Sequence, residues 1–122
     1  MIPVYQRTSV DCFRACVASV LEIPYEDTPS LPDWGWEEPL FHWAQDRGLR
    51  VDFDHSRDGV PPKAWCVMFL AWNGLPGRSE NGHCVVFSKS ADSFIAHDPW
   101  PGVPETEPYG EPRLWLWFSK VI

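Results

Sequence analysis

The chain has 122 residues and a formal net charge of −7 at pH 7, and 44% of its residues are hydrophobic. This length suffices for a single domain over residues 1–122 with a buried core, and the hydrophobic content argues against intrinsic disorder. The acidity disfavours nucleic acid and anionic membrane surfaces as partners, because both call for basic patches, whereas it would suit a neutral or basic peptide.

The N-terminal stretch predicts no targeting segment. Residues 1–7 lack a basic region followed by an apolar run, and no apolar run approaches the roughly 20 residues needed to span a bilayer. The four cysteines lie at positions 12, 16, 66 and 84, a spacing unlike that of a secreted disulfide framework. We therefore expect a cytoplasmic protein with reduced cysteines and no membrane partner, and the oligomeric state stays open.

The first predicted element is a helix from about Cys12 to Glu22. Apolar residues recur in it at helical spacing and indicate one buried face: Phe13, Cys16, Val17, Val20 and Leu21. We expect Asp11 to be the N-cap, with its carboxylate accepting from N–H groups of the first turn. Cys12 then lies at the helix start, where those groups and the helix dipole favour a thiolate. The plain alternative is that Cys12 is one more small residue of the core.

A loop, a second helix and two strands are predicted next. Residues 25–34 form the loop, and a helix is expected over 36–47 with Gly48 as its stop. One face of this helix is apolar: Trp36, Leu40, Trp43 and Ala44. A short strand is expected at 49–53, and residues 65–72 are almost continuously apolar, as in a strand covered on both faces.

The last third of the chain is predicted to complete an antiparallel sheet. We expect strands at 83–87, 93–97 and 113–118, the first two paired as a hairpin. Helices followed by antiparallel strands indicate an α+β fold.

Four side chains far apart in the sequence are expected to converge on one site. If the predicted hairpin forms, His83 and Asp98 lie side by side at its open end. Asp98 could then fix the imidazole tautomer, and His83 could take the proton of the Cys12 thiol. Gln6 could donate its amide N–H to an oxyanion. Each residue also has an ordinary structural role, and it is their joint placement that favours catalysis.

These motifs resemble papain-like cysteine proteases, most closely the double-glycine leader peptidases of bacteriocin exporters and their stand-alone relatives. That family carries a Gln, then Asp-Cys-Gly-x-x-Cys at a helix start, a His that begins a strand, and an Asp-Pro after the next strand. Here the matching elements are Gln6, Asp11–Cys16, Gly82–Val86 and His97–Pro99. The resemblance covers most of the chain, in the family's order, and implies a papain-like fold of helices packed on an antiparallel sheet.

By this resemblance Cys12 is the nucleophile, His83 the general base, Asp98 the residue that orients it, and Gln6 the oxyanion donor. It implies a cysteine peptidase that acts on a peptide or protein substrate without a cofactor or metal. Cys16 matches a second family cysteine that packs inside the helix, whereas the family glycine after the nucleophile is Phe13 here. Because Phe fills space that Gly leaves open, we do not expect a double-glycine preference to carry over.

Three interpretations of the site compete. The first is a cysteine peptidase or a related thiol acyl-transfer enzyme, which would carry the same triad. The second is a catalytically silent binding or inhibitor module on a papain-like scaffold. The third is a metal site made of Cys12, Cys16, His83 and Cys84. Adjacent strand residues point to opposite faces, however, and the C-x2-C spacing of common zinc sites is missing. His42 and His97 match no family position and are expected to be structural or exposed.

Overall fold

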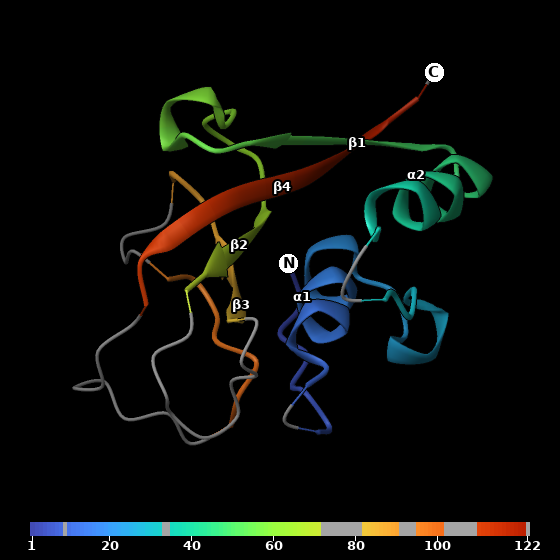
Figure 1. The fold of residues 1–122 in the computed structure, drawn as a ribbon, viewed down its shortest axis with the longest axis horizontal. Coiled ribbons are helices and arrows are strands. Elements are labelled where there is room, and N and C mark those ends of the chain that lie inside the picture. Colours follow the sequence, from blue (N-terminus) through green and yellow to red (C-terminus); the bar gives the residue numbers. More distant parts are fainter. Residues whose placement is uncertain (9, 33–34, 72–81, 91–94, 102–109, 122) are drawn as a thin grey trace.

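The structure, a computed structural model, describes residues 1–8, 10–32, 35–71, 82–90, 95–101 and 110–121. The helices of this part are α1 (Cys12–Leu21) and α2 (Glu37–Asp46), with short 3-10 turns at Tyr25–Asp27 and Arg57–Gly59. Its strands are β1 (Leu49–Asp54), β2 (Cys66–Leu70), β3 (His83–Phe87) and β4 (Pro112–Lys120). All pair antiparallel in the order β1-β4-β2-β3 (Figure 1). The predicted α+β class is therefore confirmed.

The two helices begin and end close to where the sequence places them. The stop predicted for the second helix is also found, because Gly48 has a φ of +70°, a left-handed conformation that favours glycine. Within the described residues, no helix has both the length and the apolar character that crossing a bilayer requires.

The predicted antiparallel pairing of residues 83–87 with 93–97 is found at one bridge within the described residues, in a register that differs from the expected one. Along its whole length β3 pairs with β2, from Leu70 opposite His83 to Cys66 opposite Phe87. On the other edge of β3, His97 makes a single antiparallel bridge to Val86, while residues 93 and 94 lie outside the described part. Pro99 follows closely and lacks an N–H, so it cannot donate to a continued ladder.

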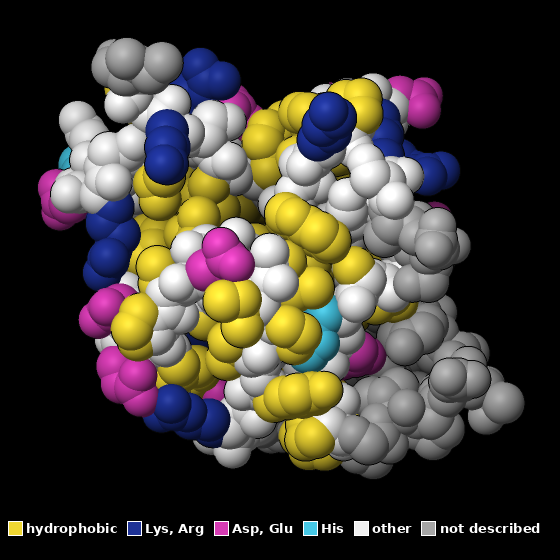
Figure 2. All heavy atoms as spheres, turned by 180° about the vertical axis from the view of Figure 1, so that it is seen from behind, with side chains coloured by type: hydrophobic (Ala, Val, Ile, Leu, Met, Phe, Trp, Pro, Cys, Tyr) yellow, Lys and Arg dark blue, Asp and Glu magenta, His cyan; other side chains and the backbone are white. Residues whose placement is uncertain are grey.

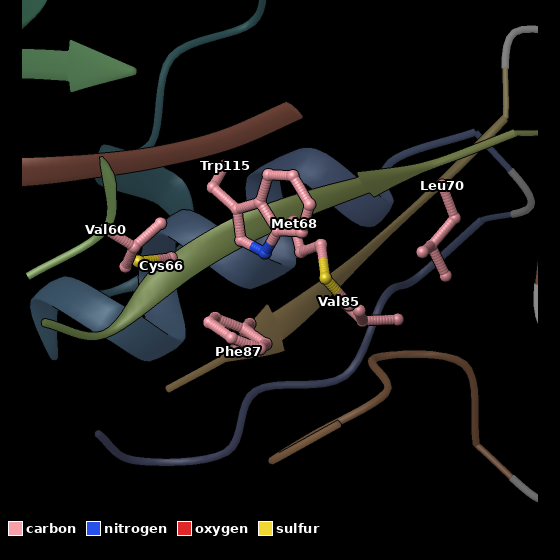
Figure 3. Close-up of a cluster of buried hydrophobic side chains, with 7 residues drawn as sticks. All are labelled: Val60, Cys66, Met68, Leu70, Val85, Phe87 and Trp115. Atoms are coloured by element: carbon pink, nitrogen blue, oxygen red, sulfur yellow. The ribbon is translucent and has the colours of Figure 1, made fainter. Parts of the chain in front are cut away.

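The sheet buries a different set of side chains on each face. One set packs beneath loop residues, with β2, β3 and β4 as its main contributors (Figure 3): Val60, Cys66, Met68, Leu70, Val85, Phe87 and Trp115. The other face receives the helices, since Cys16 and Val17 of α1 pack with Val67 and Val86 of the strands. Alternation along β2 and β3 explains the division, because successive strand residues point to opposite faces.

α2 covers the half of the sheet that α1 leaves open. Trp43 of this helix meets Phe118 of β4 edge to face, with ring centroids 6.2 Å apart. Leu40 and Ala44 are fully buried, as the predicted apolar face requires. On the face seen in Figure 2, hydrophobic side chains gather around the middle, and several Lys and Arg side chains lie toward the margin.

Candidate active site

Cys12 is the first residue of α1 and lies against the start of β3. Its side chain is 7% exposed and packs with Cys84 and Val86. The sulfur accepts a hydrogen bond from the backbone N–H of Cys84, with 3.3 Å between the two atoms. The sulfur is therefore held at the junction of a helix start and a strand start, where backbone N–H groups favour a negative charge.

Asp11 occupies the N-cap position, but it does not cap the helix with its carboxylate. The carboxylate turns back instead and accepts from the N–H groups of Arg7 and Thr8, each at 2.9 Å, and from the hydroxyl of Tyr25 at 2.6 Å. The predicted side-chain cap is therefore wrong, because the oxygens of the carboxylate accept from these donors instead. Burial opposes the charge of Asp11, yet the hydrogen bonds outweigh it and hold its pKa below the ordinary 3.8.

His83 and Asp98 form a buried pair beside the sulfur. Nε2 of His83 lies 2.8 Å from Oδ1 of Asp98, and the side chains are 0% and 9% exposed. Nδ1 of the His83 ring is also buried, and no described residue makes a hydrogen bond of normal length and angle with it. Gly82, just before His83, has a φ of +111°, which residues with a side chain rarely adopt. This glycine lets the chain turn sharply into β3.

The pKa of the Cys12 thiol falls from its ordinary 9.0 to about 5. The largest cause is a hydrogen bond from the Cys84 thiol; burial acts in the opposite direction, and the interaction with His83 and the backbone N–H of Cys84 add to the lowering. A shift of this size corresponds to about 5 kcal/mol in favour of the thiolate. At neutral pH the sulfur of Cys12 therefore carries a negative charge.

The pKa of His83 moves in the direction that complements this charge. Burial acts to lower it, but the hydrogen bond with Asp98 and the nearby sulfur of Cys12 outweigh burial and raise the pKa above its ordinary 6.5. Between the pKa of Cys12 and about pH 6.5 the site therefore favours a thiolate beside an imidazolium. Such a pair contains a ready nucleophile and a proton to donate.

The pKa values of the other three cysteines are shifted upward. Burial raises the pKa of Cys66 to about 12 and that of Cys16 well above 9.0, and both side chains are 0% exposed. For Cys84, the interaction with the Cys12 sulfur and burial raise the pKa well above 9.0. All four cysteines are free thiols. Of the four thiols, Cys12 alone has a lowered pKa.

Gln6 contacts the segment that carries Asp98 through its backbone and not through its side-chain amide. Its backbone N–H donates to the carbonyl oxygen of Pro99 at 2.8 Å, which ties this segment to the residue after Asp98. The side-chain amide donates to the carbonyl oxygen of Thr8 at 2.7 Å. Gln6 is not among the described residues that line the cleft next to Cys12.

A cleft of about 690 Å³ opens onto the sulfur. It lies between the start of α1, lining residues within 25–32 together with Trp36, and residues near the end of β2 and the start of β3. Its lining includes the aromatic rings of Phe13, Trp36 and Phe69, and it also includes His83 and Cys84. Cys12 itself is among the residues that line this cleft.

The structure thus brings three of the four predicted residues together and reveals one that the sequence did not assign. Cys84 appeared in the sequence only as a candidate metal ligand, yet its backbone and its thiol both act on the Cys12 sulfur. Its position directly after His83 at a strand start was the available signal. Among the described residues, no three His, Cys, Asp or Glu side chains converge in a way that would hold a metal ion. His42 is 70% exposed, and Nε2 of the buried His97 bonds to the carbonyl oxygen of Val4.

Comparison with protein-family models, with curated proteins and with solved structures gave no significant match.

Proposed function

We propose that the protein is a papain-like cysteine peptidase, or a related thiol acyl-transfer enzyme, that attacks a peptide or other amide bond with Cys12. One observation carries this proposal. A sulfur with a pKa of about 5 lines a cleft, next to an imidazole that is hydrogen-bonded to a carboxylate at 2.8 Å. Strongly shifted pKa values of neighbouring groups in a cleft are typical of catalytic sites.

The reaction begins with the thiolate of Cys12. It attacks the carbonyl carbon, and the C=O electron pair moves onto oxygen. The C–N bond then breaks as the imidazolium of His83 gives its proton to the departing amine, leaving an acyl group on the sulfur as a thioester. Neutral His83 next takes a proton from water or from an acceptor amine, whose attack frees the thiolate. Asp98 orients the ring and stabilises its protonated form throughout.

The oxyanion would form beside the start of α1. The first N–H groups of a helix have no partner within the helix, and the Asp11 carboxylate does not take them here. We assign them as the first oxyanion donors. Gln6 would contribute, as the family resemblance implies, after its amide turns from Thr8 toward the cleft.

A peptide or protein substrate in a reducing compartment fits the rest of the chain. The four free thiols and the net charge of −7 favour a cytoplasmic enzyme with no nucleic acid or membrane partner. The resemblance to double-glycine leader peptidases motivates the papain-like scaffold, with the specificity altered by Phe13.

Turnover of two small substrates tests the roles of Cys12 and His83. With p-nitrophenyl acetate, Cys12→Ala should abolish the rapid release of nitrophenolate, whereas Cys66→Ala should retain it. Nitrophenolate leaves without a proton, so His83→Ala should slow the first, acylating release of nitrophenolate only by raising the pKa of Cys12. An acyl p-nitroanilide releases an amine that needs a proton. On this substrate the rate of His83→Ala should therefore fall by about a further 100-fold or more, beyond the effect seen with the ester.

His42→Ala is the matched control, because this histidine is exposed on α2. Thermal melts should show that the Cys12 and His83 variants remain folded. Full turnover by Cys12→Ala would falsify the nucleophile assignment, and equal losses of His83→Ala on ester and anilide would remove the general-acid role.

A silent binding module is the second candidate, favoured by the small exposure of Cys12 and by the amide of Gln6 being bound to Thr8. Iodoacetamide separates the two candidates at pH 7. An active thiol should be alkylated far faster at Cys12 than at Cys66, as read by peptide mass spectrometry. Equal and slow labelling of both would support the binding module.

A further inference from the structure

The site contains two cysteine sulfurs that interact directly. The sulfur of Cys12 accepts a hydrogen bond from the backbone N–H of Cys84, with 3.3 Å between the two atoms, and a second one from the Cys84 thiol. Both side chains belong to one buried cluster and are only 7% and 5% exposed, yet both residues line the cleft. When Cys12 is a thiolate, the two sulfurs therefore carry a single proton between them.

The arrangement of the chain suits a covalent link between these two sulfurs and not between others. An N–Cα bond is about 1.5 Å long, so the Cα atom of Cys84 lies within about 5 Å of the Cys12 sulfur, which the Cys84 side chain can reach. Cys16 lies one turn further along α1, and Cβ atoms at this spacing are about 5–6 Å apart, whereas a disulfide needs about 3.5–4.5 Å. Cys66 belongs to the cluster on the opposite face of the sheet.

The two thiols differ in a way that gives each a separate task in oxidation. Cys12 has a pKa of about 5 and is the thiolate of the pair, and thiolates are the form of cysteine that hydroperoxides oxidise. The pKa of Cys84 is raised, and the interaction with the Cys12 sulfur is the largest cause. Oxidation of Cys12 to an uncharged sulfenic acid removes this cause, so the second thiol becomes easier to ionise once the first has reacted.

We propose that Cys12 and Cys84 form a peroxide-reactive pair, in which Cys12 is oxidised first and Cys84 closes a reversible disulfide. The Cys12 thiolate attacks one oxygen of hydrogen peroxide, the O–O bond breaks, and the other oxygen leaves as water with a proton from the imidazolium of His83. Cys12 is now a sulfenic acid. The Cys84 sulfur then attacks the Cys12 sulfur, the S–O bond breaks, and the hydroxide leaves as water with the proton of the Cys84 thiol.

This modification goes beyond the proposed function, because it uses the same thiolate but no acyl group. The disulfide removes the nucleophile of the site until a dithiol reductant restores it. It also protects Cys12, since a sulfenic acid without a neighbouring thiol is oxidised further to a sulfinic acid, which dithiol reductants do not reverse.

Peptide mapping after oxidation tests the pair directly. Trypsin cleaves after Lys and Arg and places each cysteine in its own peptide, over residues 8–14, 15–47, 64–78 and 79–89. The folded protein is treated with hydrogen peroxide at pH 7, denatured, blocked with N-ethylmaleimide, digested and analysed by mass spectrometry. We expect peptide 8–14 to be joined to 79–89, at least about tenfold more than any other pairing, and dithiothreitol to release both.

Two variants separate the roles within the pair. Cys84→Ser should form no such link, and its Cys12 should accumulate as a sulfinic acid that dithiothreitol does not reverse. Cys66→Ala is the matched control, since it removes a buried thiol from the other face of the sheet and should form the wild-type link. Thermal melts establish that both variants are folded.

The outcomes separate this inference from the proposed function. A link from Cys12 to Cys16, a link between two protein molecules, or four free thiols after peroxide treatment would each overturn the inference. So would sulfinic acid at Cys12 of the wild-type protein to the same extent as in folded Cys84→Ser. No readout here uses an ester or amide, so turnover with a failed link sinks the inference alone. A protein that forms the link but acylates with no substrate leaves the inference standing and sinks the proposed function.

Discussion

Lowering the pH should reverse the order of reactivity between Cys12 and an ordinary thiol. At pH 5.5, a thiol with a pKa of about 5 is about three-quarters ionised, while one with the ordinary 9.0 is ionised to about 3 parts in 10,000. At pH 9 the first is fully ionised and the second half ionised. The ratio of the two thiolate fractions therefore changes by about 1,000-fold between these pH values.

This change does not depend on how well a reagent reaches the sulfur. Low exposure of Cys12 slows its reaction at every pH, and a thiolate of low pKa is intrinsically less nucleophilic, by about 40- to 100-fold for four pKa units. Both factors are the same at pH 5.5 and pH 9, so they cancel when the two ratios are compared.

The assay uses a dipyridyl disulfide, whose exchange with a thiolate releases a coloured thiopyridone. The rate of the wild-type protein is divided by that of a small cysteine peptide at each pH, and Cys12→Ser identifies the phase that belongs to Cys12. We expect this quotient to be about 1,000-fold larger at pH 5.5 than at pH 9. A quotient that is the same at both pH values would show that Cys12 is an ordinary thiol, and the argument for a thiolate–imidazolium pair would be refuted.

Three further predictions concern the neighbours of the sulfur. Cys84→Ala removes the thiol that contributes most to the low pKa of Cys12, so the midpoint of the exchange rate against pH should move upward, and an unmoved midpoint would contradict this role. Asp98→Asn should lower the pKa of His83 and slow anilide turnover less than Cys12→Ala does. A pH–rate profile checks both effects. A loss of turnover as large as that of Cys12→Ala would argue against a purely orienting role. Gly82→Ala should destabilise the fold by about 1–3 kcal/mol, because alanine is strained at a φ of +111°; urea melts with no shift would refute this.

The free energy of unfolding should also depend on pH through the shifted pKa values of Cys12 and His83. The depressed pKa of Cys12 contributes stability that is fully present above pH 9 and is lost as pH falls toward 5. The raised pKa of His83 has the opposite sign, since its contribution is present below about 6.5 and is lost as pH rises through the folded value. Removal of Cys12 should therefore remove the part of the stability that grows as pH rises from about 5 to 9, and urea melts over this pH range would measure the change.

The helices were predictable because their signals are local. The apolar spacing in residues 12–22 and the stop at Gly48 depend on neighbours in the chain, and both are found. The predicted strands near 49–53, 83–87 and 113–118 also overlap β1, β3 and β4. Pattern alone therefore indicates element type well in this chain.

The pairing of the strands and the hydrogen-bond partners of Asp11 were not predictable, because they depend on residues that are distant in the sequence. β3 pairs with β2 along its whole length and meets the segment after it at the bridge between Val86 and His97, and this arrangement depends on residues distant in the sequence. Asp11 had the right position for a helix cap, yet Tyr25, 14 residues later, is among the donors that claim its carboxylate. His83 and Asp98 still meet, although the hairpin register that motivated the prediction is wrong.

Covalent capture of an acyl group tests the central claim most directly. The protein is mixed with p-nitrophenyl acetate at pH 6, quenched in acid within the burst, and examined by intact-mass and peptide-mass spectrometry. We predict a single acetyl group, located on Cys12 and missing from Cys12→Ser. An acetyl group on another residue, or none while nitrophenolate is released no faster than in buffer, would contradict the assignment of Cys12 as an acyl-transfer nucleophile.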